Sequence, residues 1–201
     1  MLINGSKLKN RPVLSLHLGG PAAIARELII DPDKLKIVGF YVEGPSVKNG
    51  ESGNILETSF IREFSPVGMI VDSTDVFTSE GEVVKLDKIL EIGFELVGKK
   101  VITKKKTKLG KVIDFTVDAE SFKIMQLIVQ RPPIKAFLDP ELVISRREIV
   151  EVTDELVIVK DEEAKIRKKA IKEDFVPNFV NPFREPNFSQ ADSRTPGGRD
   201  S

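Results

Sequence analysis

The sequence predicts an all-β protein made of two similar small units of roughly 80 residues each, followed by a short helix and an irregular tail. An internal repeat relates the two units. Short runs rich in Val, Ile and Phe alternate with turn residues, and the C-terminal segment mixes Phe with Pro and Asn. Within each unit, five or six short strands without a long helix favour a small barrel or highly coiled sheet, because closure removes exposed edges.

The repeat begins with residues 30–42, which align with residues 117–129 at an offset of 87 and without a gap. In each copy an apolar strand ends in Asp, a short acidic turn follows, and a second apolar strand returns. Asp suits this turn because its side chain can accept a hydrogen bond from the backbone two residues on. Leu35 and Phe122 then start the returning strands at equivalent places.

A second block of similarity follows at an offset of 88, so one residue is gained in the loop between the blocks. Residues 60–65 align with residues 148–153, and residues 69–71 align with residues 157–159. Two separate blocks in register indicate a duplication rather than the general likeness of two β-rich segments.

The second copy has the clearer strand pattern. Apolar runs at 99–103 and 111–117 surround residues 104–110, which predicts a hairpin with Gly110 near its bend. Further short strands are expected at 124–129, 142–145, 149–153 and 156–159. The first copy follows the same plan less clearly, because residues 18–23 make the strand pattern of its opening hairpin hard to recognise.

The second copy resembles the PRC-barrel family. The resemblance lies in residues 96–118, in the strand ending at Val129 and in the final strand at 156–159. Its most diagnostic piece is a Gly-x-Val-x-Asp pattern formed by Gly110, Val112 and Asp114. Members of this family include the cytoplasmic domain of the photosynthetic reaction-centre H subunit and the C-terminal domain of the bacterial ribosome maturation factor.

The resemblance implies a six-stranded β-barrel in each copy, with one domain at residues 1–80 and the other at residues 86–160. It covers the second copy well and the first weakly, because Ala23, Ile24 and Ala25 replace the diagnostic pattern there. The family is known for interaction modules in RNA metabolism, ribosome assembly and membrane-complex organisation. No catalytic or ligand-binding residues carry over from it.

Composition restricts the classes of partner that the chain is expected to bind and the cellular compartment in which it is expected to lie. Lys and Arg total 31, as do Asp and Glu, so the global charge gives no argument for nucleic acid or membrane binding. The absence of Cys excludes disulfides, thiolate metal sites and Cys nucleophiles, and it favours the cytoplasm. No stretch approaches the ~20 apolar residues of a membrane span, so we expect a soluble, cytoplasmic protein.

No catalytic, cofactor-binding or metal-binding residues are predicted. His17 is the only histidine, and without Cys it cannot form a metal cluster; we expect it at the edge of the first hairpin. Residues 31–33 lack the pattern of a calcium loop. Residues 19–21 lack the Lys and Ser/Thr of a phosphate loop, and Pro21 removes a backbone donor.

The predicted hairpin of the second copy carries a cluster of lysines. Seven Lys and no acidic residue lie between Lys99 and Lys111. The candidate contacts for an anionic partner are Lys104, Lys105, Lys106 and Lys108. They suit phosphates, anionic lipid headgroups or an acidic protein surface. The alternative is a solvated hairpin whose lysines protect an exposed edge, and the absence of interleaved aromatic residues disfavours readout of single-stranded RNA.

The C-terminal part differs from both copies. Residues 161–174 open with acidic and continue with basic residues, which suits a short surface helix or spacer. Residues 175–201 form a Phe/Pro/Asn tail, which we expect to be disordered from Gln190 onward. Its large apolar side chains predict a docking motif, in cis or on a partner. The motif residues are Phe175, Phe179, Phe183 and Phe188.

These features predict a non-catalytic binding or scaffolding protein that acts through protein–protein contacts. The alternative is an RNA- or ribosome-associated maturation factor that uses the basic hairpin at Lys99–Lys111. An enzyme or small-ligand protein is the third possibility, and it would require a deep pocket that encloses His17 and carboxylates.

Overall fold

The computed structural model describes residues 1–47, 54–133 and 140–161, all within one compact unit that spans residues 1–166. The predicted helix at 161–174, apart from Asp161, and the Phe-containing tail lie outside the described residues. Strands dominate the described residues, which confirms the predicted all-β, barrel-like fold class. No helix in the described part is both long and apolar enough to cross a membrane.

The first sheet contains seven strands in the order β6-β7-β2-β3-β4-β5-β8. Its first three strands are β2 (Arg11–Ser15), β3 (Gly20–Asp31) and β4 (Lys36–Glu43). The remaining strands are β5 (Ile55–Glu57), β6 (Glu63–Ser65), β7 (Gly68–Val71) and β8 (Phe77–Thr78). Strands β2 and β7 pair in parallel, and the other neighbours are antiparallel.

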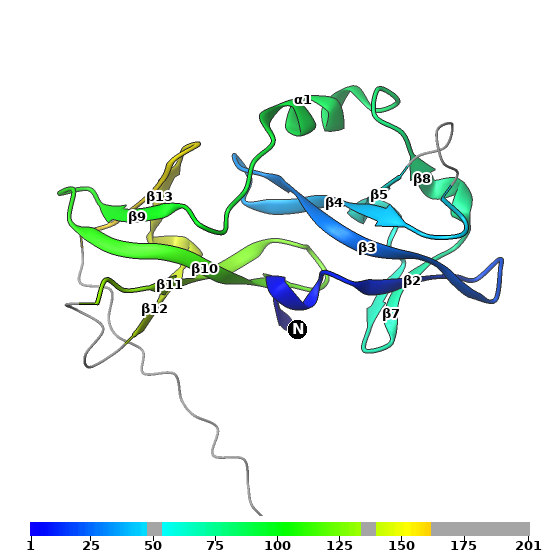
Figure 1. The fold of residues 1–201 in the computed structure, drawn as a ribbon, viewed down its shortest axis with the longest axis horizontal. Coiled ribbons are helices and arrows are strands. Elements are labelled where there is room, and N and C mark those ends of the chain that lie inside the picture. The colour runs from blue at the N-terminus through cyan, green and yellow to red at the C-terminus, as the bar shows by residue number, and fades with distance from the viewer. Residues whose placement is uncertain (48–53, 134–139, 162–201) are drawn as a thin grey trace, which may run out of the picture. The chain divides into compact units, whose positions relative to one another are not determined.

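The second sheet has the strand order β12-β11-β10-β9-β14-β13. Strands β9 to β14 correspond in turn to β2 to β7, so this is the order of the first sheet in the opposite direction and without a counterpart of β8 (Figure 1). Its strands are β9 (Lys100–Thr103), β10 (Lys108–Asp118), β11 (Ile124–Gln130), β12 (Glu141–Ser145), β13 (Ile149–Val152) and β14 (Leu156–Val159). Strands β9 and β14 pair in parallel, as β2 and β7 do. Among the described residues both strand paths are open, so the sheets curl around their cores without the complete hydrogen-bonded closure that the sequence suggested.

Equivalent residues of the two sheets make equivalent contacts. Asn10 and Gly98 both have a positive φ, and their N–H groups donate to the carbonyls of Ala25 and Val112. Short 3-10 turns at Thr58–Phe60 and Arg146–Glu148 join the equivalent strands on each side. The duplication inferred from two blocks of sequence therefore extends to backbone detail beyond those blocks.

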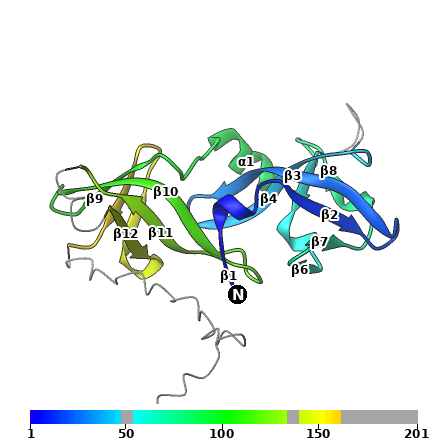
Figure 2. The same cartoon turned by 60° about the horizontal axis from the view of Figure 1, so that its bottom comes forward.

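The N-terminal strand β1 (Leu2–Asn4) belongs to the second sheet (Figure 2). It pairs antiparallel with β10, with Leu2 opposite Asp118. A 3-10 turn, Gly5–Lys7, follows, and Ser6 donates to the Asp114 carboxylate from both its N–H and its hydroxyl. The sequence assigned residues 1–80 to the first domain, whereas this strand hydrogen-bonds to the second sheet. Strand pairing over such a separation has no local signal in the sequence.

A helix, α1 (Val84–Ile92), lies between β8 and β9 in the chain, where the sequence predicted no helix of length (Figure 1). It ends at Gly93, whose φ of 57° is the left-handed conformation that glycine favours after a helix. Its buried residue Leu86 packs against Ile29 and Ile55 of the first sheet. The helix has only nine residues, too few for its apolar spacing to stand out.

Gly110, which the sequence predicted near the bend of the second hairpin, is the third residue of β10 and lies within the strand rather than in the turn. The pairing of β10 with β9 shifts register between Lys108 and Gly110, which marks a bulge. The φ of Gly110 is 152°, and a Cβ there would overlap the backbone carbonyl of Gln130. Close approach of the β11 backbone therefore requires glycine at this position.

The two sheets join through a reciprocal contact between their equivalent turns. The Ile37 N–H donates to the Phe122 carbonyl and the Ile124 N–H donates to the Leu35 carbonyl, each at 2.9 Å. A β-bridge pairs Lys36 with Lys123, which are equivalent in the repeat. Each half therefore contributes the same backbone groups to the contact, as the two subunits do in a two-fold symmetric dimer.

Side chains reinforce this contact. Phe122 is 4% exposed, and its ring packs edge-to-face against Phe40 at 6.0 Å and Phe64 at 6.3 Å between centroids. Arg146 Nη1 donates to the carbonyls of Leu35 and Ile124, at 2.8 and 3.0 Å. One continuous apolar core thus includes residues of both sheets.

We predict that Phe122→Ala lowers the free energy of unfolding by about 3–5 kcal/mol, because it removes a buried ring that contacts both halves. Urea denaturation followed by circular dichroism measures this change. The matched control is Phe60→Ala, whose ring is 44% exposed and should cost less than about 1 kcal/mol. Equal losses for the two variants would contradict a central role for Phe122.

Candidate functional site

The reciprocal contact uses one end of each of the long strands β3 and β10 and does not involve the turn at the other end. Strand β3 runs from the turn at 16–19 to the turn at 32–35, and β10 runs from the turn at 104–107 to the turn at 119–122. At about 3.3 Å per residue, each strand separates its two turns by about 35 Å. The turns at 16–19 and 104–107 are therefore remote from the joining contact.

The structure brings Lys104, Lys105 and Lys106 together on the turn between β9 and β10, with Lys108 at the start of β10. All four side chains are exposed. The Lys104 N–H donates to the Val159 carbonyl at 3.0 Å, and the Lys105 N–H donates to the Asp161 carboxylate at 2.8 Å. These bonds hold the turn against the end of β14, so the lysines sit on an ordered support. Whether they contact a partner stays a prediction.

The equivalent turn of the first sheet, residues 16–19, carries exposed apolar side chains instead of lysines. Leu16 and Leu18 occupy the places of Lys104 and Lys106, and they are 55% and 51% exposed. His17 lies exposed between them, at the hairpin turn as predicted, and its N–H donates to the Asp72 carbonyl at 3.0 Å. The sequence alone did not indicate this apolar turn, because the exposure of Leu16 and Leu18 is a property of the folded chain.

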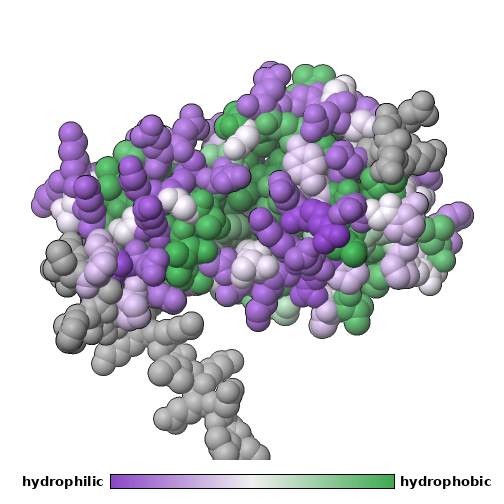
Figure 3. Space-filling model, in the orientation of Figure 1, coloured by the Kyte–Doolittle hydropathy of each residue, from purple (hydrophilic) through white to green (hydrophobic). Residues whose placement is uncertain are grey.

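A groove of about 680 Å³ lies next to the lysine turn, across β9, β10, the end of β11 and the start of β14. Its lining includes the apolar residues Val101, Ile102 and Leu156, of which Val101 is fully buried. Gly110 also lines it, at the point where β10 approaches the Gln130 carbonyl. Pro132 and Pro133, which follow β11, line it as well. Figure 3 shows hydrophilic side chains around hydrophobic surface where β9 and β10 lie.

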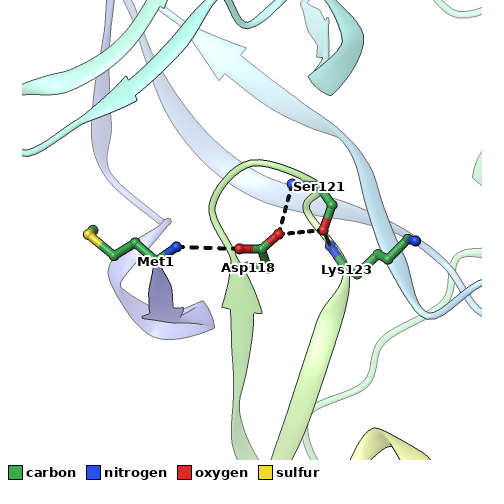
Figure 4. A network of polar contacts seen from close by, with 4 residues as sticks. All are labelled: Met1, Asp118, Ser121 and Lys123. Carbon is green, nitrogen blue, oxygen red and sulfur yellow. Dashed lines mark hydrogen bonds and ion pairs between the residues drawn. The ribbon is translucent and has the colours of Figure 1, made fainter.

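Asp118 organises the turn that begins at the end of β10. Its carboxylate accepts hydrogen bonds from the Ser121 hydroxyl at 2.6 Å and the Ser121 N–H at 3.1 Å (Figure 4). The N-terminal ammonium of Met1 lies 3.4 Å away on its other side. The hydrogen bonds from Ser121, followed by the contact with the ammonium group, hold the pKa of Asp118 below its ordinary value.

Asp31 does the same for the equivalent turn of the first sheet. It is 4% exposed, and it accepts from the Lys34 N–H at 3.0 Å and the Lys34 ammonium at 2.9 Å. Burial acts to raise the pKa of Asp31, but the contacts with Lys34 outweigh it and the pKa is lowered. Asp anchors the predicted turn in both copies, and its carboxylate accepts from the backbone N–H three residues on, where the sequence predicted two.

The turns that follow the two Asp residues end in strained residues. Leu35 and Phe122 have φ values of 43° and 55°, in the left-handed region that bulky side chains rarely adopt. Both side chains are buried, and both carbonyls accept the hydrogen bonds that join the two halves. The Asp-anchored turns therefore position the groups that make the reciprocal contact.

Comparison with protein families places the second sheet in a known group. The model of the PRC-barrel domain matches residues 91–173, which include β9 to β14. The chain carries a PRC-barrel domain. The match begins inside α1 and leaves the first sheet outside, so a second PRC barrel at residues 1–80 stays a prediction that rests on the internal repeat. Comparison with curated proteins gives no match.

The PRC-barrel domain contains both the lysine turn and the groove. Its diagnostic Gly110 is the residue at which β10 approaches Gln130, and Val112 is buried beneath it. Asp114 accepts from Ser6, so the family pattern also ties the domain to the N-terminal strand. The predicted docking motif of the tail, Phe175 to Phe188, lies outside the described residues.

We predict that acid weakens this fold partly through Asp118. Because its folded pKa is depressed, its contribution to stability is present above the unfolded value of about 3.9 and is lost as the pH falls through the folded value. Asp118→Asn should therefore lower stability at pH 7 by about 1 kcal/mol or less, and its unfolding free energy should fall less between about pH 5 and pH 2.

Urea denaturation over this pH range measures the effect. The control is Glu120→Gln, which removes an exposed carboxylate from the same turn. Parallel pH curves for the wild type and Asp118→Asn would contradict the role assigned to Asp118.

Proposed function

We propose that this chain is a non-catalytic binding or scaffolding protein that acts through protein–protein contacts. The observation that carries the proposal is the filled interior of both sheets. Phe40 and Ile37 in the first sheet and Leu127 and Ile124 in the second are all fully buried. Apolar side chains occupy the space in which a ligand-binding barrel would hold its ligand, so the surface is the place for recognition.

The PRC-barrel domain supports this proposal, because the family comprises interaction modules. The turns at 16–19 and 104–107, which are remote from the joining contact, support it further. The first presents leucines and the second presents lysines, so the two halves offer different contacts to partners. Exposed leucines at a turn are the type of feature that protein interfaces bury.

We predict that a protein partner crosslinks to the full-length chain in cells and is lost when the apolar turn is changed. Leu16→Ser with Leu18→Ser should reduce recovery of that partner at least several-fold, because it removes two exposed apolar contacts. The measurement is quantitative crosslinking mass spectrometry, followed by binding of the purified partner. The matched control is Val67→Ser with Val84→Ser, which changes two valines that are 66% and 71% exposed.

Equal recovery from both variants would remove the apolar turn from the mechanism. A chain ending at Asp174 tests the Phe-containing tail in the same assay. Identical partners for this chain and the full-length chain would show that the tail is not required.

An RNA- or ribosome-associated role is the second candidate, favoured by the exposure of four lysines on one ordered hairpin. On this hypothesis the lysines contact phosphates. We predict that changing Lys104, Lys105, Lys106 and Lys108 to Glu abolishes RNA retention. Four contacts to a single strand also predict a slope of about −3 for the logarithm of affinity against the logarithm of salt concentration.

Co-sedimentation with ribosomes and filter binding measure this effect. The control changes four exposed lysines elsewhere to Glu, which are Lys7, Lys9, Lys85 and Lys88. Unchanged co-sedimentation of the first variant, or equal loss in both, would contradict specific use of the hairpin.

A further inference from the structure

The groove of the PRC-barrel domain combines an apolar floor with a basic rim. The floor consists of Ile102 and Leu156, which are half-buried, above the fully buried Val101. Its volume of about 680 Å³ lies within the ~300–1,000 Å³ of ordinary ligand pockets. An apolar surface of this kind favours a ligand that brings apolar side chains of its own.

The rim carries the charge. Four cationic side chains line the groove, and among its described lining residues there is no carboxylate. They are Lys100, Lys108, Lys111 and Arg131. An adjoining recess shares Lys100 and Lys111 with the groove and is also lined by Lys99, Glu95, Asp154 and Glu155. Five positive against three negative charges among the described lining residues of groove and recess still leave an excess of positive charge, so the groove favours a ligand with carboxylates around an apolar centre.

The composition of the groove distinguishes between classes of partner. No aromatic side chain lines its described part, so bases have nothing to stack on, and its apolar floor offers nothing to a phosphate backbone. An anionic membrane would contact projecting groups rather than a recessed floor. A peptide can place apolar side chains on the floor and carboxylates on the rim at the same time.

We propose that this groove binds a short acidic and apolar peptide segment of a partner protein. The inference rests on the proposed function and names the chemistry of the partner at one site. The ordered lysine turn beside the groove extends the positive surface along which the flanking acidic residues of the peptide lie. Glycine at position 110 maintains the site, because a Cβ there would overlap the Gln130 carbonyl and displace β11, whose last residue lines the groove.

The test uses the full-length chain and a short fluorescein-labelled peptide with central leucines flanked by glutamates. Fluorescence polarisation should give saturable binding that weakens with added salt. Lys100→Glu with Lys111→Glu should weaken binding roughly tenfold, because attraction becomes repulsion at the rim. The control, Lys85→Glu with Lys88→Glu, makes the same change in net charge at two exposed lysines of α1, outside the lining of the groove, and should weaken binding less than about threefold. Replacing the leucines of the peptide by serine should abolish binding.

Several outcomes would overturn the inference. Equal weakening by the two charge variants, or undiminished binding of the serine peptide, would show a general polyanion surface. Tighter binding to anionic vesicles or to a short RNA than to the peptide would show a different class of partner. Much tighter peptide binding by a chain ending at Asp174 would show that the tail competes for the groove. If the peptide fails while the crosslinked partner is retained, the proposed function stands and the groove proposal fails.

Discussion

The described fold depends on the reciprocal hydrogen bonding between two Asp-anchored turns. Asp31 and Asp118 fix the turns, the turns place Leu35 and Phe122 in an uncommon backbone conformation, and the carbonyls of those residues receive the N–H groups of Ile124 and Ile37. Neither half can make this contact alone, since each supplies both a donor and an acceptor to the other. Phe122 then packs on rings of the first sheet, and the two apolar cores become continuous.

A reciprocal contact of this type buries the same surface on both halves. The two turns that form the contact must keep the same backbone geometry, whereas the turns at the other ends of β3 and β10 have no such requirement. The residues of the turns agree with this difference. The turns that form the contact follow Asp at equivalent positions, but the turns at the other ends carry Leu16 and Leu18 in one half and Lys104 and Lys106 in the other. The two halves thus present different side chains at equivalent turns of one architecture.

Within the PRC-barrel domain, a backbone constraint and a surface groove meet at the same residue. Gly110 allows β10 to approach β11 closely at a bulge, and it also lines the groove that has an apolar floor and basic residues at its rim. The interior of the sheet is filled, as the full burial of Leu127 and Ile124 shows. We therefore propose recognition at the surface of this domain, where the lysine turn and the groove adjoin.

The sequence by itself determined the β-rich class, the repeat and the Asp-containing turns, because strand patterns and turn preferences are local properties of the chain. It also located the lysine cluster and the family of the second copy. Tertiary structure decided that β1 joins the second sheet, that α1 packs on the first, and that Gly110 lies within a strand. It also decided that equivalent turns bind each other and that a groove forms beside the lysines. These features depend on contacts between residues far apart in the chain. Each such contact costs chain entropy and buries apolar surface, and a local sequence pattern contains information about neither.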